Sequence, residues 1–550
     1  MKLFSFFLIC SLATLTKCEV FTALVDMEDL LDTEAVLMRT LGSYIDAQEK
    51  RLDSLKRLEG SKVNTIRKAA EYAKEHEEAS SDISEYLNNP INAYLLVKRL
   101  TSDWHHVERL MQDDVGRVFI DRIAGYRETL KFPTDEDLNG AAVALMRLQD
   151  TYHLKTNAVA SGVLNGVQYS SEMSAHDCFE LGRQSYNNGD YYHTSLWMHE
   201  AMDRLQQETN KTTTREDILE YLAFSTYMQG NVKVALTLTN ELLELVPSHQ
   251  RAQGNKVYYE NQIKSVPVRQ KKGEDGGDDV DEAQYAVSEK ETRPKRSNDE
   301  VPEREMYEML CRGEGMMSAD KTSKLKCRYT THNNPYFILS PIKEEEAHLN
   351  PNIWILHDVM NDAEISTIKR LAQPRFKRAT VQNYKTGELE TATYRISKSG
   401  WLKDSDHPHV SAVNKRVQAF TGLTVDTAEE LQVVNYGIGG HYEPHFDFAR
   451  KEETNAFKSL GTGNRIATVL FYMSDVAQGG ATVFPHLNAA LWPEKGSAAF
   501  WYNLHKSGEG DYLTRHAACP VLAGSKWVSN KWIHERGQEF LRPCGLTLDS

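Results

Sequence analysis

The residues from Gln432 to Asp447 read QVVNYGIGGHYEPHFD, and they decide how the C-terminal half of the chain folds. Apolar and aromatic residues lead into a glycine-rich turn, after which His445 and Asp447 stand one residue apart. Because alternate residues of a β-strand point to the same face, the imidazole and the carboxylate are expected side by side. Taken alone, the pair is more typical of ordinary surface or hydrogen-bonding chemistry than of a metal site.

A third ligand would change that interpretation, and four downstream histidines are candidates: His486, His505, His516 and His534. We favour His516, which stands near the start of an apolar run. Two histidines and one carboxylate on one face, with open positions opposite, are typical of non-haem Fe(II) oxygenases. Lys526 follows ten residues later and begins the run KWVSNKW. It could pair with the far carboxylate of a dicarboxylic co-substrate that chelates the metal through its other end.

Short β-branched and aromatic runs surround these residues and are separated by Gly, Asp, Asn and Pro. This rhythm predicts an antiparallel β sandwich or barrel. The expected strands cover residues 431–436, 466–473, 481–485, 498–502 and 526–533. Helical segments are expected around 362–372 and 409–421, and the whole domain is expected to span residues 305–550.

Residues 151–264 alternate helical segments with Gly-Asp or Gly-Asn turns, which is typical of tetratricopeptide repeats that bind peptides. The region is rich in tyrosine, and aromatic grooves dock extended proline-rich ligands. Arg251, Asn255 and Tyr258 share one helical face and could bind peptide carbonyls. An ordinary solvated helix face and core tyrosines are the alternative. The tyrosines proposed for the groove are Tyr186, Tyr221, Tyr227 and Tyr258.

Residues 19–150 are expected to form long amphipathic helices with leucines at coiled-coil-like spacings. Helices packed within one chain and a dimerisation arm remain equal alternatives. Residues 265–304 carry many charges and glycines, which predicts a flexible linker. Residues 1–18 resemble a secretory signal peptide, and no other apolar run is long enough to cross a membrane. The formal net charge of −14 argues against nucleic acid as the main partner.

A secretory route permits disulfides and glycosylation. We expect Cys311–Cys327 and Cys519–Cys544, among three possible pairings, because each closes a short loop. Cys178 lies in an apolar helical context and is expected to be a buried thiol. Asn210 is the only clear glycosylation sequon. The last residues, TLDS, are not an endoplasmic reticulum retention signal.

Several long motifs resemble the α subunit of animal collagen prolyl 4-hydroxylase. They are YGIGGHYEPHFDFAR at 436–450, GTGNRIAT at 461–468, GGATVFP at 479–485, GEGDY at 508–512 and RHAACPVL at 515–522. The resemblance extends upstream to YYHT at 191–194 and YEMLCRGEG at 307–315. It implies a multidomain α+β chain whose catalytic domain is a double-stranded β-helix (jelly roll), and a reaction that uses Fe(II), 2-oxoglutarate, O2 and ascorbate.

The resemblance also assigns roles to residues. It makes His445, Asp447 and His516 iron ligands and Lys526 the partner of the distal carboxylate of 2-oxoglutarate. Around Lys526 it places Tyr436, Thr482 and Trp532, and near the substrate proline it places Arg465 and His534. The product would be 4-hydroxyproline at the Y position of Gly-X-Y, which stabilises the collagen triple helix.

The same resemblance implies partners and a compartment. The middle domain would bind procollagen, the N-terminal helices would dimerise, and protein disulfide isomerase would be the β subunit of an α2β2 tetramer. That partner's retention signal would hold the complex in the endoplasmic reticulum lumen.

Three residues depart from the family pattern: His441, where relatives commonly carry Gln; His486, where they carry Glu; and Phe224, where they often carry Tyr. We interpret both histidines as neutral variation, while Phe224 affects only the fine peptide preference. A hydroxylase of lysine or of a regulatory protein and a non-catalytic scaffold are the rivals. Lys526 and the tyrosine-rich repeats argue against the first, and the complete ligand set argues against the second.

Overall fold

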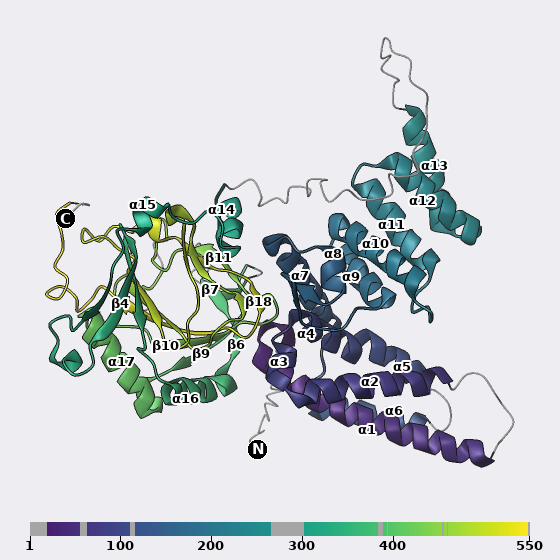
Figure 1. Cartoon of the computed structure of the whole chain (residues 1–550), viewed down its shortest axis with the longest axis horizontal. Helices are drawn as coiled ribbons and strands as arrows, with labels where there is room; N and C mark the ends of the chain where they lie inside the picture. Colours follow the sequence, from purple (N-terminus) through teal and green to yellow (C-terminus); the bar gives the residue numbers. More distant parts are fainter. Residues whose placement is uncertain are drawn as a thin grey trace, which may run out of the picture.

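The computed structural model describes residues 19–54, 63–110, 116–265, 302–382, 389–392, 394–453, 456–458 and 460–547. The expected signal peptide and almost all of the expected linker lie outside these residues. Figure 1 shows a sheet-rich catalytic domain beside a helical N-terminal domain, with a second helical domain beyond it. Among the described residues, no helix combines the length and the apolar character that a membrane crossing needs.

The N-terminal domain is a set of helices that pack on one another. Leu30, Leu37, Leu41 and Tyr44 of the first helix are all buried in the chain's own core, so their periodicity reflects packing within one chain. The elements are η1 (Val20–Thr22), α1 (Leu24–Ser54), α2 (Val63–Ser81), α3 (Ile83–Leu87), α4 (Pro90–Lys98), η2 (Arg99–Asp103), α5 (Trp104–Leu110), α6 (Arg117–Thr129) and α7 (Asp135–Tyr152).

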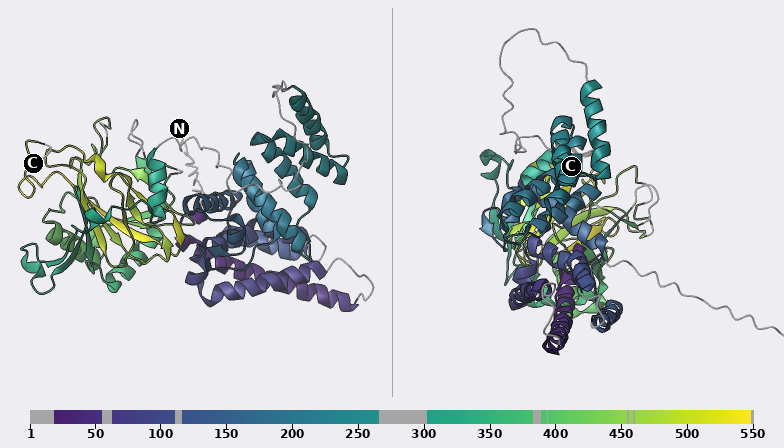
Figure 2. Two further views of the ribbon diagram at one scale, coloured as in Figure 1. Left: turned by 45° about the horizontal axis from the view of Figure 1, so that its top comes forward. Right: turned by 90° about the vertical axis from the view of Figure 1, so that its right-hand side faces the viewer.

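The second domain stacks helix pairs, as the repeat pattern predicts. Its elements are α8 (Thr156–Ala160), β1 (Val163–Leu164), β2 (Val167–Gln168), α9 (Ala175–Asn187), α10 (Tyr191–Gln207), α11 (Arg215–Met228), α12 (Val232–Leu245) and α13 (Gln250–Ser265). Gly189 and Gly230 turn the chain between paired helices at positive φ, which glycine adopts without steric cost. Cys178 is a buried free thiol, as expected. Figure 2 shows this domain rising away from the N-terminal helices.

Two buried ion pairs join the helical domains. Lys98 lies 2.9 Å from Asp103 and 2.7 Å from Asp177 of α9. His193 of α10 lies between the carboxylates of Asp190, at 2.7 Å, and Asp150 of α7, at 3.2 Å. Burial lowers the pKa of His193, but the two carboxylates outweigh it and raise the pKa to about 9.

The catalytic domain contains a large sheet of strand order β3-β4-β5-β16-β12-β19-β10-β9-β6, a small sheet of order β11-β17-β14-β15, and the two-stranded sheets β13-β18 and β7-β8. Helices α16 and α17 cover the outer face of the large sheet and share a core with it. These helices match the two expected segments. The helices of the domain are α14 (Pro302–Cys311), α15 (Ala319–Thr322), η4 (Pro335–Phe337), α16 (Asp362–Ala372), η5 (Gln373–Arg375), η6 (Asp404–Asp406), α17 (Pro408–Thr421), η7 (Pro485–Leu487) and η8 (Tyr512–Thr514).

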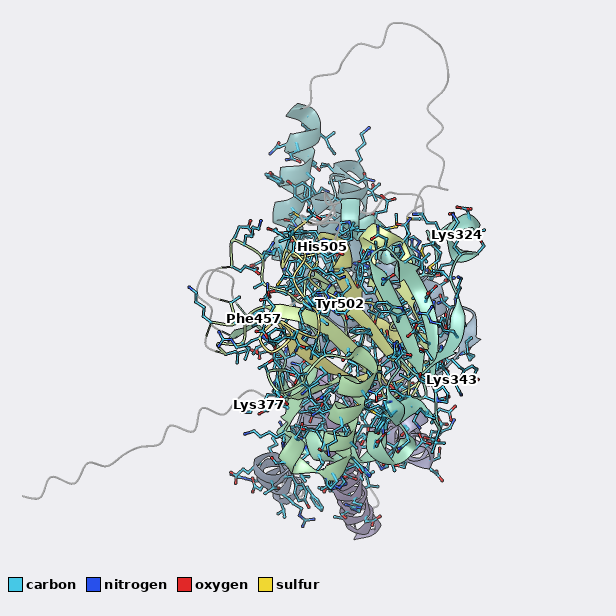
Figure 3. All side chains as sticks on the ribbon, turned by 90° about the vertical axis from the view of Figure 1, so that its left-hand side faces the viewer. Lys324, Lys343, Lys377, Phe457, Tyr502 and His505 are labelled. Carbon is cyan, nitrogen blue, oxygen red and sulfur yellow. A yellow bond between two sulfur atoms is a disulfide. The ribbon has the colours of Figure 1, made fainter. Side chains whose placement is uncertain are left out.

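All pairings between its strands are antiparallel among the described residues, as the sequence predicts. In Figure 3, which faces this domain, Phe457 lies on the side opposite Lys324 and Lys343. The strands are β3 (Cys327–Thr330), β4 (Ile342–Leu349), β5 (Asn352–His357), β6 (Lys377–Arg378), β7 (Thr380–Gln382), β8 (Leu389–Thr391), β9 (Lys398–Leu402), β10 (Leu431–Asn435), β11 (Tyr442–His445), β12 (Arg465–Tyr472), β13 (Gln478–Gly479), β14 (Thr482–Phe484), β15 (Ala489–Leu491), β16 (Ala498–Tyr502), β17 (His516–Ala518), β18 (Val521–Ala523) and β19 (Trp527–His534).

The disulfide pairing differs from the expectation. Cys311 is bonded to Cys519, whereas Cys327 and Cys544 are exposed free thiols. The predicted pairs Cys311–Cys327 and Cys519–Cys544 are wrong in this structure, because closeness in sequence is not closeness in the fold. Helix α14 packs on the small sheet, where Cys519 follows β17, while β3 carries Cys327 at the far edge of the large sheet.

The chain leaves the N-terminal domain and enters the catalytic domain at neighbouring points. Arg312, just after α14, donates a hydrogen bond from Nη1 to the carbonyl oxygen of Thr151 near the end of α7, at 2.9 Å. The helical repeats therefore lie between two chain positions that touch.

Candidate active site

The three candidate ligands come from two neighbouring strands of the small sheet. His445 at the end of β11 is the register partner of His516 at the start of β17, and Asp447 follows β11 by two residues. Their ligand atoms lie within 4.8 Å of one another. The Asp447 carboxylate is 3.8 Å from Nε2 of His445 and 3.6 Å from Nε2 of His516. The structure therefore brings together the residues that the sequence singled out.

Backbone carbonyls orient both imidazoles. Nδ1 of His445 lies 2.7 Å from the carbonyl oxygen of Glu443, and Nδ1 of His516 lies 3.0 Å from that of Thr514. A carbonyl can only accept, so each Nδ1 carries the proton and each Nε2 presents a lone pair to the cluster. Burial, and then the neighbouring His516, place the pKa of His445 well below its usual range. The ring is thus neutral, as a metal ligand must be.

A chain of hydrogen bonds fixes Asp447 from the large sheet. The hydroxyl of Thr468 on β12 donates to the carboxylate at 2.8 Å, the amide of Asn503 donates to Thr468 at 2.9 Å, and the indole of Trp501 donates to Asn503 at 2.9 Å. Burial raises the pKa of Asp447, but His516 and His445 outweigh burial and bring the pKa to about 2. The carboxylate is therefore ionised. Two imidazoles and one carboxylate fit Fe(II) by the chemistry of the donors.

Lys526 lies just before β19 and is almost fully buried, with 1% of its surface exposed. Burial alone lowers its pKa to about 7. None of the described carboxylates forms an ion pair with it, and its Nζ lies 5.0 Å from the ring centroid of Tyr436. A buried ammonium without a counter-ion is costly, so this position fits an incoming anion.

The other residues predicted around Lys526 lie at two different locations. Tyr436 faces Lys526, and Thr482 on β14 accepts a hydrogen bond from the Tyr472 hydroxyl at 2.9 Å. Trp532 instead lies at the opposite end of β19, where it pairs in register with Thr468 and contacts the guanidinium of Arg465 at 3.8 Å.

Arg465 and His534 lie together, as expected, and they share one partner that the sequence did not indicate. Glu429 accepts two hydrogen bonds from the Arg465 guanidinium, at 2.5 and 3.0 Å, and lies 2.9 Å from Nε2 of His534. Burial raises the pKa of Glu429, but Arg465 and His534 outweigh burial and bring it to about 2. Arg465 also reaches the carbonyl oxygen of Asp447 at 3.4 Å.

The two additional histidines lie outside the ligand cluster. His441 is buried ahead of β11, and burial places its pKa well below the usual range. His486 is partly exposed and lies 3.6 Å from Glu303 of α14. Neither belongs to the group of side chains that could hold the metal.

The tyrosines of the repeat domain form a continuous row. Ring centroids are separated by 4.9 Å between Tyr186 and Tyr221, 5.8 Å between Tyr186 and Phe224, 6.2 Å between Phe224 and Tyr227, and 5.8 Å between Tyr227 and Tyr258. The rings are half-buried, except that of Tyr258, which is exposed. Phe224 thus occupies the middle of the row.

The polar residues predicted beside this row differ in their surroundings. Arg251 is exposed and forms an ion pair with Glu220 of α11, and Asn255 is half-buried on α13. Asn210 is exposed in the loop between α10 and α11, where a glycan has room.

Three family models match the chain in order. They describe the N-terminal region of the prolyl 4-hydroxylase α subunit at residues 23–166, the prolyl 4-hydroxylase peptide-substrate-binding domain at 175–265, and the 2OG-Fe(II) oxygenase superfamily at 431–534. Prolyl 4-hydroxylase subunit alpha-1 of Homo sapiens and of Mus musculus are each 50% identical, over 96% of both chains. Subunit alpha-2 of Caenorhabditis elegans is 49% identical, over 98% of this chain and 96% of its own.

The chain belongs to the prolyl 4-hydroxylase α subunits. It is therefore a dioxygenase that depends on Fe(II) and 2-oxoglutarate and hydroxylates proline, and ascorbate is a reductant typical of this family. Membership confirms the resemblance, the multidomain α+β fold class and the cofactors predicted from the sequence. Within an α subunit, residues 175–265 are the domain that binds the peptide substrate.

Proposed function

We propose that this α subunit hydroxylates C4 of proline at the Y position of Gly-X-Y in procollagen chains, in the endoplasmic reticulum lumen. The observation that carries the proposal is the register pairing of His445 with His516 beside Asp447, with one possible ligand atom from each side chain within 4.8 Å of the others. The signal-peptide-like residues 1–18 support the compartment.

His445, Asp447 and His516 hold the Fe(II) in this proposal. When bound, Fe(II) with 2-oxoglutarate and O2 supplies the oxidant for C–H hydroxylation, and 2-oxoglutarate becomes succinate and CO2. The backbone carbonyls on both Nδ1 atoms and the Thr468 hydroxyl keep the three ligands oriented before the metal arrives. L-Ascorbate would be the reductant that keeps the bound iron ferrous.

Lys526 binds the distal carboxylate of 2-oxoglutarate, with Tyr436 and Thr482 beside it. A charge-assisted contact of this kind is worth roughly 1.5–3 kcal/mol. Trp532 lies at the other end of β19, where its ring packs against the guanidinium of Arg465. Burial of the pocket excludes water, which strengthens each polar contact inside it.

Arg465 and His534 place the substrate proline. Glu429 holds both of their side chains, and the contact between Arg465 and the Asp447 carbonyl sets their position relative to the metal. These residues therefore act by binding and orientation.

The repeat domain holds the peptide. Its aromatic row suits a polyproline II segment, which offers flat pyrrolidine faces and no internal hydrogen bonds. Tyr186, Tyr221, Tyr227 and Tyr258 supply stacking surface, and Arg251 and Asn255 bind backbone carbonyls. Asn210 is proposed to be glycosylated.

Protein disulfide isomerase is the proposed β subunit of an α2β2 tetramer, with the N-terminal helices of two α subunits forming the dimer contact. This part rests on the family resemblance. Sizing of the co-expressed protein with and without the isomerase tests it, and a monomeric, fully active α subunit would refute it.

The ligand assignment is tested with His445→Ala and His516→Ala. Each variant should release no succinate on a (Pro-Pro-Gly)n peptide, while the affinity of the repeat domain for the peptide is unchanged. His486→Ala is the matched control and should retain activity. Hydroxylation by either ligand variant would refute the assignment.

A further inference from the structure

The N-terminal segment Val20–Asp26 packs against the catalytic domain as well as against the helices of its own domain. Residues 20–25 are all buried. The side chains of Ala23 and Val25 lie in the catalytic core with Val433 of β10 and Leu402 of β9. A second core cluster joins residues of the helical domain to Ile396, Ile438 and Leu522 of the catalytic domain, among others. Residues more than 400 positions apart in sequence thus share one core.

The segment reaches the strand end that leads into the co-substrate pocket. The backbone N–H of Val25 donates to the side-chain oxygen of Asn435 at 3.4 Å. The amide of Asn435 donates in turn to the carbonyl oxygen of Lys526 at 3.4 Å, and the N–H of Tyr436 donates to that same oxygen at 3.1 Å. A buried polar chain therefore links the N-terminal segment to the backbone of both pocket residues.

An ion pair secures the neighbouring strand. Asp26 at the start of α1 pairs with Lys398 of β9, which is buried. Lys398 is the register partner of Asn435. Leaving one member of such a buried pair without its partner costs several kcal/mol, so the segment and β9 are held together firmly.

The glycine-rich loop between β10 and β11 is enclosed by the helical domain. The N–H of Ile438 donates to the carbonyl oxygen of Phe21 at 3.2 Å. A Cβ atom on Gly437 would lie 2.1 Å from that oxygen, so only glycine permits this approach. On the other side, Arg147 of α7 donates to the carbonyl oxygen of Gly439 at 3.2 Å.

The end of α7 also reaches the second ligand strand. The Tyr152 hydroxyl donates to the carbonyl oxygen of Pro520, close after β17. The N–H of Val521 donates to Gly440 in the glycine-rich loop at 3.1 Å. The loop before His445 and the chain after His516 are therefore joined to each other and to α7.

We infer that the segment Val20–Asp26 and helix α7 position the 2-oxoglutarate pocket, by fixing the backbone of Tyr436 and Lys526 through Asn435 and the glycine-rich loop. The helical domain is then part of the catalytic apparatus in addition to any role in subunit contacts. Phe21, Asp26 and Arg147 are positioning residues, because they act through the loop and strand they hold. The inference rests on the proposed assignment of Lys526 to 2-oxoglutarate.

Gly437→Ala tests the inference by separating the two backbones in the full-length complex. We expect 2-oxoglutarate to bind at least tenfold more weakly to the Fe(II)-loaded protein, measured anaerobically by calorimetry, with peptide affinity unchanged. In the metal-free protein the Ile438 amide should exchange with deuterium faster than in the wild type. Gly42→Ala is the matched control, since nothing lies within 4 Å of a Cβ added there in α1.

A second variant, Phe21→Ala, removes packing instead of adding a clash. Its control for general destabilisation is Leu41→Ala, because Leu41 is a buried residue of α1 away from the catalytic domain. Phe21→Ala should weaken 2-oxoglutarate binding and speed Ile438 exchange, whereas Leu41→Ala should do neither. Lys526→Ala separates the two claims. Unchanged binding in Lys526→Ala refutes the assignment of the pocket. The positioning role is overturned if Lys526→Ala weakens 2-oxoglutarate binding while Gly437→Ala and Phe21→Ala change neither that binding nor the exchange of the Ile438 amide.

Discussion

The ligand cluster and the aromatic row of the repeat domain differ in burial, in charge and in how firmly their side chains are fixed. The cluster is buried, charged and fixed by hydrogen bonds from two sheets, so that each ligand atom has one position. The row is aromatic and half-buried except at Tyr258, and its rings contact one another mainly edge to face. Oxidation of a C–H bond needs the reacting atoms in fixed positions. A repetitive peptide, in contrast, is bound best by a surface that accepts the peptide in many registers.

Removing one hydrogen bond at the cluster should give the largest effect. In Thr468→Val, Asp447 loses the hydroxyl that orients it, and the loss of a hydrogen bond to a metal ligand costs about 10–100-fold in metal affinity or activity. Fe(II) affinity and kcat should both fall, with the peptide KM unchanged. Thr421→Val is the control, because that hydroxyl bonds only to nearby backbone groups, the carbonyl of Val417 and the N–H of Leu423. Wild-type kcat in Thr468→Val would contradict the rigid cluster.

Lys526→Ala should raise the KM for 2-oxoglutarate by about 10–100-fold, which corresponds to roughly 1.5–3 kcal/mol. Lys531→Ala is the control, since that lysine on the same strand bonds to the carbonyl of Glu429. The expected pattern is a changed co-substrate KM with an unchanged peptide KM. An unchanged co-substrate KM would move the carboxylate contact elsewhere.

The affinity for 2-oxoglutarate should depend on pH because of Lys526. Its pKa of about 7 in the free protein lies below the ordinary value of 10.5, so the side chain loses its proton as pH rises through 7. A bound dianion favours the ammonium, so binding takes up a proton and weakens progressively above about pH 7. Calorimetry in buffers of different ionisation enthalpy measures this uptake. Lys526→Met should bind weakly and show no such uptake, whereas persistent uptake would implicate another group.

The aromatic row should respond more mildly. Tyr227→Ala removes the central link between α11 and α13, and aromatic contacts are worth about threefold to tenfold in affinity. The peptide KM should rise by that factor while kcat and the 2-oxoglutarate KM stay unchanged. Tyr329→Ala, an exposed tyrosine on β3, is the control. A fall in kcat would show that the row and the cluster are coupled.

Arg251→Ala should give the smallest change, about twofold or less in peptide affinity. Its guanidinium is exposed and already paired with Glu220, and exposed ion pairs contribute little. Lys233→Ala serves as a charge control on α12. An effect as large as that of Tyr227→Ala would make the charge, and not the rings, the main determinant of recognition.

The sequence predicted those features that depend only on residues close together in the chain. The spacing of His445 and Asp447 predicted that the two side chains lie together, as they do although Asp447 stands two residues beyond β11, and the helices expected around 362–372 and 409–421 are α16 and α17. His516 required a distant strand to pair in register with His445, and only its apolar context and Lys526 suggested it. Glu429 and Asn503 carried no such signal, because the role of Glu429 exists only once β12 and β19 lie side by side, and that of Asn503 only once β12 and β16 do. The disulfide prediction failed for the same reason.

The hydrogen bond between Arg312 and Thr151 has a consequence for how the molecule could be rebuilt. Everything between these positions, including the whole peptide-binding domain, forms an excursion whose two ends meet. The repeats within it can be exchanged as a cassette if the residues that tie the segment to the rest of the chain are kept: Tyr152, Asp177, His193 and Cys311 of α14. A domain that binds a different repetitive polypeptide, inserted between the same two positions, would direct the same hydroxylation to a new class of proline-containing chains.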